Sequence, residues 1–114
     1  MRIEEFRRYC LAKKGISEDF PFDESTAVYK VGGKIFTLTD TNLKRINVKC
    51  DPLKAVVLRE KYNAVIPGYH MNKKHWNSLI MDGSLPDVLV YQWLDDSYKL
   101  VLTSLPKGKQ QELE

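Results

Sequence analysis

The chain has 114 residues, of which 43% are hydrophobic, and a formal net charge of +3; this length fits one domain and excludes two, and the composition is close to that of globular proteins rather than of disordered chains. No apolar run reaches the roughly 18 residues that a membrane span requires, and no apolar segment typical of a secretory signal follows the first residues. We therefore expect a cytoplasmic protein without membrane contact, in which Cys10 and Cys50 are reduced, buried thiols.

The N-terminal segment, residues 2–14, predicts a helix. Ile3, Phe6 and Cys10 recur at helical spacing and would form its apolar face. Two lysines followed by Gly15 are typical of a helix C-terminus, because cations favour the last turn and glycine accepts the backbone conformation that ends it.

Two runs rich in β-branched and aromatic residues flank Gly32-Gly33, and glycine pairs favour the positive φ angles of a two-residue turn. This pattern predicts a β-hairpin formed by residues 27–31 and 34–39. A two-residue turn here would place Tyr29 opposite Phe36 and Lys30 opposite Ile35.

Residues 45–50 predict a third strand with one buried and one solvated face. Its apolar residues alternate strictly with the polar residues Arg45, Asn47 and Lys49. We therefore expect a basic stripe along one side of the sheet.

A second helix is expected to begin at residues 51–52, where an aspartate can cap the helix and a proline can take its first position. Leu53, Val56 and Val57 form its predicted apolar stripe. The helix should end near residues 62–63.

Two more strands are predicted at residues 65–68 and 75–81, separated by a loop. The last helix begins at residues 84–87 and ends before Pro106, since proline does not continue a helix. Its apolar residues recur at the spacing of a core-packing helix: Val90, Leu94, Val101 and Leu105.

Together these elements predict an α+β fold with the order α-β-β-β-α-β-β-α. With this order of elements we expect an antiparallel sheet with the helices packed on one face, as a two-layer α/β sandwich.

The net charge hides an uneven distribution along the chain. Residues 30–81 contain ten basic and three acidic side chains and carry +7, whereas residues 1–29 carry −1 and residues 82–114 carry −3. A basic block of this kind can concentrate a polyanion near the protein. A solvated surface rich in lysine would give the same pattern, so both interpretations stay open.

Several segments resemble the MmcQ/YjbR family, in order along residues 1–109. They are Phe20-Pro21-Phe22, Tyr29-Lys30-Val31-Gly32-Gly33-Lys34-Ile35-Phe36, Asn47-Val48-Lys49-Cys50-Asp51-Pro52, Ile66-Pro67-Gly68-Tyr69-His70-Met71-Asn72-Lys73-Lys74-His75-Trp76-Asn77, Asp82-Gly83-Ser84-Leu85-Pro86-Asp87, Asp96-Ser97-Tyr98 and Leu105-Pro106-Lys107. Asp23 departs from the glycine found at this position in many members.

This resemblance implies one domain over residues 1–109, followed by a short polar tail at 110–114. It also implies a fold like that of CyaY and frataxin, with helices on one side of a sheet and the other side partly open. The family's proposed role is DNA binding through a double-wing arrangement, which becomes an expectation for this chain.

The segment of residues 69–77 is the strongest candidate for binding. It contains no acid, and lysines can neutralise phosphates while asparagine reads a base edge and aromatic rings stack on bases. The candidate residues of this segment are Tyr69, His70, Asn72, Lys73, Lys74, His75 and Trp76. The competing interpretation is that Trp76 packs into the core and the lysines are simply solvated.

A second candidate is a basic platform on the open sheet face, formed by Lys30, Arg45, Asn47 and Lys49. The Gly32-Gly33 turn and the turn at residues 40–44 could act as wings, with Lys34 and Lys44 near their tips.

No catalytic or metal-binding pattern stands out in the sequence. His70 and His75 lie five positions apart without a nearby cysteine or carboxylate to complete a site. Both cysteines fall on predicted apolar faces, where thiols are unreactive. We therefore expect no enzyme activity, no cofactor and no metal.

The sequence-based hypothesis is a non-enzymatic protein that binds double-stranded DNA. Asn72, His75 and Trp76 would contact bases or sugars. The phosphates would be neutralised by Lys34, Arg45, Lys49, Lys73 and Lys74. The alternative is a protein- or peptide-interaction module that presents the open sheet face and Trp76 to a partner.

Overall fold

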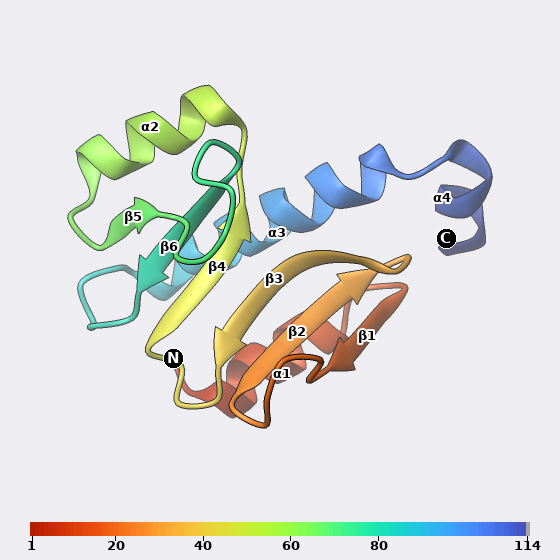
Figure 1. Ribbon diagram of the computed structural model, residues 1–114, viewed down its shortest axis with the longest axis horizontal. Helices are drawn as coiled ribbons and strands as arrows, with labels where there is room; N and C mark the ends of the chain where they lie inside the picture. The colour runs from red at the N-terminus through yellow and green to blue at the C-terminus, as the bar shows by residue number, and fades with distance from the viewer. Residues whose placement is uncertain (114) are drawn as a thin grey trace.

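The computed structural model describes residues 1–113, which form one six-stranded antiparallel sheet with helices on one face (Figure 1). The strand order is β1-β2-β3-β4-β6-β5. In chain order the elements are α1 (Ile3–Leu11), β1 (Ile16–Asp19), β2 (Thr26–Val31), β3 (Lys34–Asp40), β4 (Arg45–Lys49), α2 (Pro52–Lys61), β5 (Val65–Pro67), β6 (Trp76–Ile80), α3 (Asp87–Ser104) and α4 (Lys107–Leu113). The predicted α+β class, with helices on one side of an antiparallel sheet, is confirmed.

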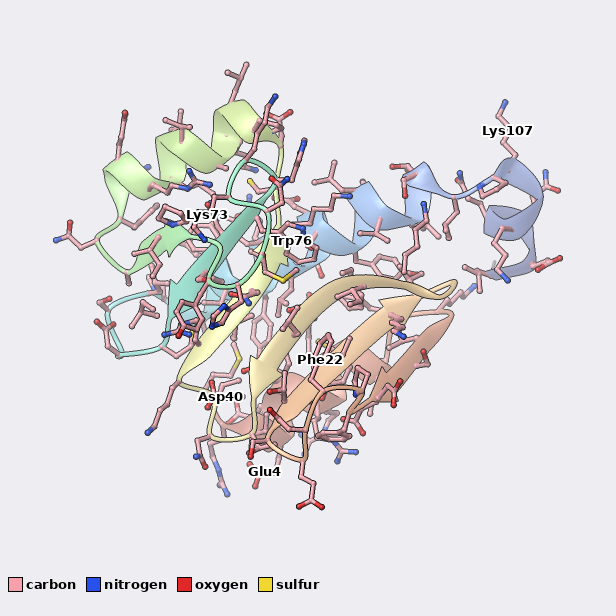
Figure 2. The ribbon with its side chains drawn as sticks, viewed as in Figure 1. Glu4, Phe22, Asp40, Lys73, Trp76 and Lys107 are labelled. Carbon is pink, nitrogen blue, oxygen red and sulfur yellow. The ribbon has the colours of Figure 1, made fainter. Side chains whose placement is uncertain are left out.

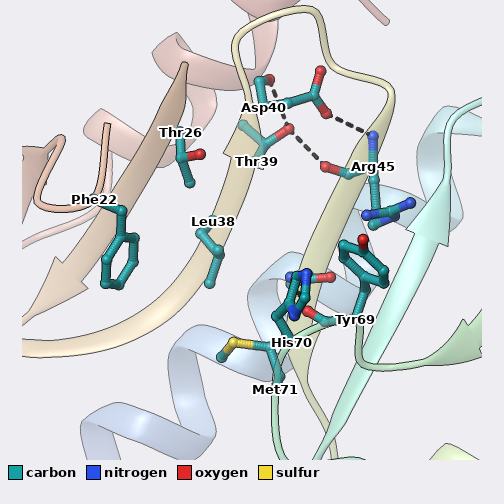
Figure 3. Close-up of a pocket in the computed structure, with 10 residues that line it drawn as sticks. Phe22, Thr26, Leu38, Thr39, Asp40, Arg45, Tyr69, His70 and Met71 are labelled. Atoms are coloured by element: carbon teal, nitrogen blue, oxygen red, sulfur yellow. Dashed lines mark hydrogen bonds between the residues drawn. The ribbon is translucent and has the colours of Figure 1, made fainter. Parts of the chain in front are cut away.

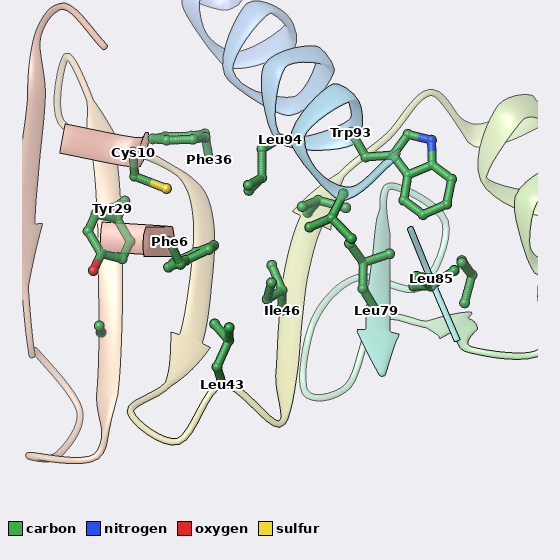
Figure 4. Close-up of a cluster of buried hydrophobic side chains, with 14 of the residues drawn as sticks. Phe6, Cys10, Tyr29, Phe36, Leu43, Ile46, Leu79, Leu85, Trp93 and Leu94 are labelled. Atoms are coloured by element: carbon green, nitrogen blue, oxygen red, sulfur yellow. The ribbon is translucent and has the colours of Figure 1, made fainter. Parts of the chain in front are cut away.

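One core lies between the sheet and the helices α1 and α3 (Figure 4). Phe6 of α1 meets Tyr29 of β2 edge to face, with ring centroids 5.5 Å apart. Ile46 of β4 and Leu94 of α3 are both fully buried in the same cluster. The apolar faces that sequence periodicity assigned to the first and last helices are therefore the faces that build the core.

Two elements are present in addition to the predicted order. Ile16–Asp19 forms the edge strand β1, which pairs with β2, and Lys107–Leu113 forms α4. Strand β1 is held by Glu18, which accepts hydrogen bonds from Arg7 Nε (2.7 Å), Arg7 Nη2 (2.8 Å) and Tyr29 Oη (2.7 Å). These contacts join residues far apart in sequence, which is why local patterns did not predict the strand. Helix α4 includes part of the predicted tail, and its Leu113 packs against the core.

The predicted hairpin register was right for Lys30 opposite Ile35 and wrong for Tyr29 opposite Phe36. Tyr29 pairs with Thr37, and the register shifts between Tyr29 and Lys30. The shift leaves Phe36 outside the pairing, as in a β-bulge. Phe36 is fully buried and meets Tyr98 of α3 edge to face at 5.5 Å. Packing of an aromatic ring under α3 therefore decided the register.

The predicted apolar stripe of the second helix was also wrong. Leu53, Val56 and Val57 are 81%, 47% and 57% exposed, and Ala55 is the residue of α2 that is fully buried. Helix α2 contacts β5 and β6 at the end of the sheet. A small residue such as Ala55 permits close approach there, and the larger apolar residues face outward. The helix start was predicted correctly, since the Asp51 carboxylate accepts from the backbone of Leu53 and Lys54.

Within residues 1–113, no helix is long and apolar enough to cross a membrane.

Candidate functional site

The loop of residues 68–75 joins β5 to β6 and lies across the sheet face opposite the helices, in front of β4 and β6 (Figure 1). Two buried side chains fix its first turn. Ser78 Oγ accepts from Tyr69 N at 2.8 Å and donates to the side-chain oxygen of Asn47, whose amide nitrogen lies 3.4 Å from Tyr69 O. Asn47 is only 6% exposed. The expected solvated stripe is therefore interrupted at Asn47, which anchors the loop.

The second half of the loop is held from behind by Arg59 of α2. Its guanidinium donates to Lys73 O, to Trp76 O at 3.3 Å and to Asn77 Oδ1 at 2.7 Å. Three polar contacts from one side chain fix the path of the chain into β6. Arg59 is thus a positioning residue that the sequence patterns did not identify.

Within the loop, two of the predicted binding side chains also make local contacts. Asn72 Oδ1 accepts from the backbone of Lys74 at 2.9 Å and of His75 at 3.2 Å, so it stabilises the turn. Lys73 Nζ donates to Gly68 O at 3.0 Å. Lys74 and His75 are exposed. In residues 1–113, the Lys74 ammonium has no hydrogen bond or ion pair.

Lys49 and Trp76 form a cross-strand pair next to the loop. They are register partners in β4 and β6, and strand alternation places them on the same face as Asn47 and Ser78. Trp76 is partly buried, and Figure 2 shows it beside the loop that carries Lys73. The structure thus gathers Lys49, Lys73, Lys74 and Trp76 on the open side of the sheet.

A hollow of about 400 Å³ lies between the 68–75 loop and the segment that precedes β2 (Figure 3). Phe22 stands on one side, Leu38 lies between, and Tyr69, His70 and Met71 form the other side. Phe22 is 68% exposed and Tyr69 49% exposed. His70 has a φ of 57°, in the left-handed region, where histidine is one of the few non-glycine residues that occur more often.

Arg45 brings positive charge into this hollow. Its Cζ lies 3.9 Å from the centroid of the Tyr69 ring, a cation–π arrangement. Nearby Asp40 does not pair with the guanidinium; its carboxylate accepts instead from the backbone of Asn42, Lys44 and Arg45 at 2.9–3.1 Å. Arg45 Nε is shielded from solvent and has no hydrogen-bond partner in residues 1–113.

The remaining predicted residues lie apart from this group. Lys30 Nζ lies 3.9 Å from Asp19 on the edge strand β1, and Lys34 is exposed beside the β2–β3 turn. The two proposed wings, residues 32–33 and 40–44, flank opposite ends of the seven-residue strand β3. They therefore do not stand together at one end of the sheet.

The two cysteines do not contribute to this site. Burial raises the pKa of Cys10 to about 12 and also raises the pKa of Cys50. Both remain protonated thiols at neutral pH, the form that is a poor nucleophile. The described residues, 1–113, bring together no group of three His, Cys, Asp or Glu side chains that could hold a metal.

Sequence patterns did not identify the hollow, because its walls come from distant segments. Phe22, Leu38 and Met71 line it, and no spacing rule relates them. The available signals were the Phe-Pro-Phe motif and the acid-free loop, both of which pointed to a surface without showing that they meet.

Comparison with known proteins places the chain among proteins of this architecture. The YjbR family model matches residues 11–100. The uncharacterized protein YjbR of Escherichia coli K12 is 34% identical over 115 residues, covering 99% of this chain and 98% of its own length. The uncharacterized protein YbdF of E. coli O157:H7 is 35% identical over 112 residues, covering 96% of this chain and 92% of its own length.

Two crystal structures share the fold. Deinococcus radiodurans protein DR2400 has a TM-score of 0.92 and 35% identity, covering 98% of this chain and 87% of its own. A protein from Pseudomonas syringae has a TM-score of 0.76 and 26% identity, covering 89% of this chain and 99% of its own.

Proposed function

The chain belongs to the YjbR family, and we propose that it is a non-enzymatic, cytoplasmic protein that binds double-stranded DNA through the open face of its sheet. The contact surface is the 68–75 loop with the adjoining Lys49 and Trp76. Phosphates contact the lysines, while His75 and Trp76 lie against sugars or base edges.

The observation that carries the proposal is uncompensated positive charge on a preformed loop. The 68–75 loop contains two lysines and no acid, and neither lysine has a carboxylate within ion-pairing distance among the described residues. By contrast, Arg7, Lys13 and Lys54 pair with Glu18, Asp95 and Asp96. Ammonium groups that lack a carboxylate partner keep a net positive charge for phosphates, which supply most of the affinity of such complexes.

The fixed geometry of the loop also supports the proposal. Arg59, Asn47 and Ser78 hold both halves of the loop, so binding does not first have to order it. A surface that is ordered before binding loses less conformational entropy on association.

The proposal is tested by fluorescence anisotropy with a labelled DNA duplex between about 50 and 200 mM salt. Three or four phosphate contacts predict a log–log slope of affinity against salt of roughly −3 to −4. The double variant Lys73→Glu/Lys74→Glu should lose most of the affinity.

Lys107→Glu/Lys109→Glu is the matched control, because it makes the same charge change on α4, far from the loop (Figure 2). It should bind nearly as well as the wild type. Absence of wild-type binding at 50 mM salt, or equal losses in the two double variants, would refute a DNA site at the loop.

A second function is favoured by the exposed aromatic side chains around the hollow. Phe22 is 68% and Tyr69 49% exposed, and such rings are frequent energetic centres of protein interfaces. A protein- or peptide-binding module would show weak salt dependence and would lose its partner on Trp76→Ala, whereas the DNA site predicts a steep salt dependence.

A further inference from the structure

The hollow beside the 68–75 loop has features of a ligand pocket that a duplex surface alone does not require. Its volume of about 400 Å³ falls within the range of roughly 300–1,000 Å³ typical of small-ligand sites. Aromatic rings stand at two sides, from Phe22 and Tyr69, and the aliphatic side chain of Leu38 lies between them (Figure 3). A flat, partly apolar group could lie in this space with ring contacts.

Arg45 lines the hollow together with the polar side chains of Thr26, Thr39, Asp40, Asn47 and His70. Arg45 Nε is shielded from solvent without a hydrogen-bond partner, and the guanidinium has no ion pair in residues 1–113. Leaving a buried donor unpaired costs stability. The Arg45 Cζ lies 3.9 Å from the centroid of the Tyr69 ring, so the guanidinium is held at the edge of the hollow by that contact. A planar ligand with acceptor atoms at this edge would pair with the guanidinium.

Charge around the hollow favours an anionic attachment to that planar group. Asp40 lines the hollow, but its carboxylate is already occupied by three backbone N–H groups. In the 68–75 loop, Met71 and Asn72 separate His70, which lines the hollow, from Lys73 and Lys74. A strand whose base enters the hollow and whose backbone follows the loop would bring phosphates to these lysines.

We propose that the hollow takes one unpaired nucleotide of a nucleic-acid strand, with its base between Phe22 and the packed Tyr69–His70 ring pair, whose centroids are 4.0 Å apart, and with acceptor atoms of the base toward Arg45. The neighbouring phosphates of the strand lie along Lys73 and Lys74. This inference rests on the proposed function and sharpens it, because the preferred substrate becomes DNA with an unstacked base. All four bases can stack on aromatic side chains. The pocket should therefore distinguish unpaired from paired nucleotides, and it should not distinguish one base sequence from another.

The test compares three labelled DNAs at one salt concentration: a perfect duplex, the same duplex with a single-nucleotide bulge, and a single strand. Wild type should bind the bulged duplex and the single strand more tightly than the perfect duplex. Phe22→Ala should weaken binding to the bulged duplex about 5- to 150-fold, the range expected for one base–aromatic stack. Its affinity for the perfect duplex should change less than about two-fold.

Two variants make the test specific. Phe22→Trp keeps a stacking ring and should retain the preference for the bulge. Leu53→Ala removes an exposed apolar side chain from α2 (81% exposed) and should leave all three affinities unchanged. Because Phe22 is itself 68% exposed, its replacement should not prevent folding, which circular dichroism can verify.

The outcomes separate this inference from the proposed function. Salt-dependent binding of the perfect duplex, with no gain from the bulge and no effect of Phe22→Ala, overturns the pocket and leaves the proposed function standing. Bulge binding that depends on Phe22, without duplex binding, supports the pocket and overturns the duplex site. No binding of any DNA overturns both.

A free nucleotide also has a base and a phosphate, so it could occupy the hollow in place of an unpaired nucleotide of a strand. Thymidine monophosphate should compete weakly with the bulged duplex, because it lacks the neighbouring phosphates. Competition as strong as that of the single strand, unchanged in Lys73→Glu/Lys74→Glu, would assign the hollow to a free nucleotide and overturn the proposal.

Discussion

The two faces of the sheet satisfy their polar groups to different extents. On the helix-covered face, Ser97 of α3 donates to Phe36 O at 2.5 Å and accepts from Lys49 N at 2.8 Å, while Asn77 bonds Arg59 and Ala55 O. On the open face, Arg45 keeps a buried, unpaired donor, and Phe22 stays largely exposed.

This difference indicates what the side chains of each face contribute to, either the stability of the fold or the binding of a ligand. The covered face uses apolar burial and satisfied hydrogen bonds to stabilise the fold. The open face retains an arginine with an unpaired Nε donor and exposed rings that lie outside the core, which is the pattern of a surface shaped for a ligand. Substitutions of buried residues on the covered face should therefore lower stability, whereas substitutions of exposed residues on the open face, such as Phe22, should lower binding alone.

The largest loss of stability is expected from Leu94→Ala on the covered face. Leu94 is fully buried, and truncation of a buried leucine costs about 2–5 kcal/mol in unfolding free energy. Urea unfolding measures the loss. Leu100→Ala on the same helix, where the side chain is 38% exposed, is the control. Equal losses in the two variants would contradict the packing described here.

A smaller loss is expected from Ser97→Ala. The variant removes the hydroxyl that joins α3 to both β3 and β4 and leaves buried backbone groups without that partner. Such a change costs about 1–3 kcal/mol. Ser104→Ala, where the hydroxyl bonds only its own helix, should cost less. Thermal unfolding of both variants decides whether the bridge matters.

The link between β1 and the core should depend on pH. The hydrogen bond from the Arg7 guanidinium, with a further one from Tyr29, lowers the pKa of Glu18 below its ordinary value. The unfolded chain therefore binds this proton at a higher pH than the folded chain. The stability from Glu18 is complete above the ordinary glutamate pKa and disappears as pH falls through the lowered value.

Unfolding at pH 7 and at pH 3 tests this expectation. Glu18→Gln should lower the unfolding free energy at pH 7. The difference in unfolding free energy between pH 7 and pH 3 should be smaller in this variant than in the wild type. Glu60→Gln, on the exposed side of α2, is the matched control. A wild-type-like pH dependence in Glu18→Gln would show that the Arg7–Glu18 pair does not stabilise β1.

The smallest change in stability is expected on the open face. Phe22→Ala removes a side chain that is 68% exposed, so the unfolding free energy should change by less than about 0.5 kcal/mol. Its effect should appear in binding instead. A loss of stability comparable to that of Ser97→Ala would mean that Phe22 belongs to the core, and the contrast between the two faces would not hold.

The sequence predicted well those elements whose signals are local. Periodicity of Phe6 and Cys10, the Asp51 cap and the alternation of Ile46 and Val48 each describe neighbours along the chain, and the structure has these residues buried or capping as expected. Prediction failed where distant contacts decide. Strand β1 depends on Glu18 meeting Arg7 and Tyr29.

The prediction of binding residues also succeeded where the signal was local and failed where distant contacts decide. Residue types alone pointed to the acid-free segment of residues 69–77, and the structure places most of this segment, in the 68–75 loop, on the open face. The same residue types also indicated Asn47 as solvated, whereas its amide is buried under Tyr69. Side-chain alternation gives the face of a residue but does not show what lies over that face.

By itself, the sequence determined the fold class, the family and the concentration of positive charge in residues 30–81. Only the tertiary structure decided that Phe22, Arg45 and Tyr69 surround one hollow. The physical reason is that backbone preferences and apolar periodicity act over a few residues. A pocket, by contrast, forms when segments that are more than twenty residues apart in the sequence pack together. The position of Arg59 behind the loop was settled in the same way, by contacts that form only in the folded chain.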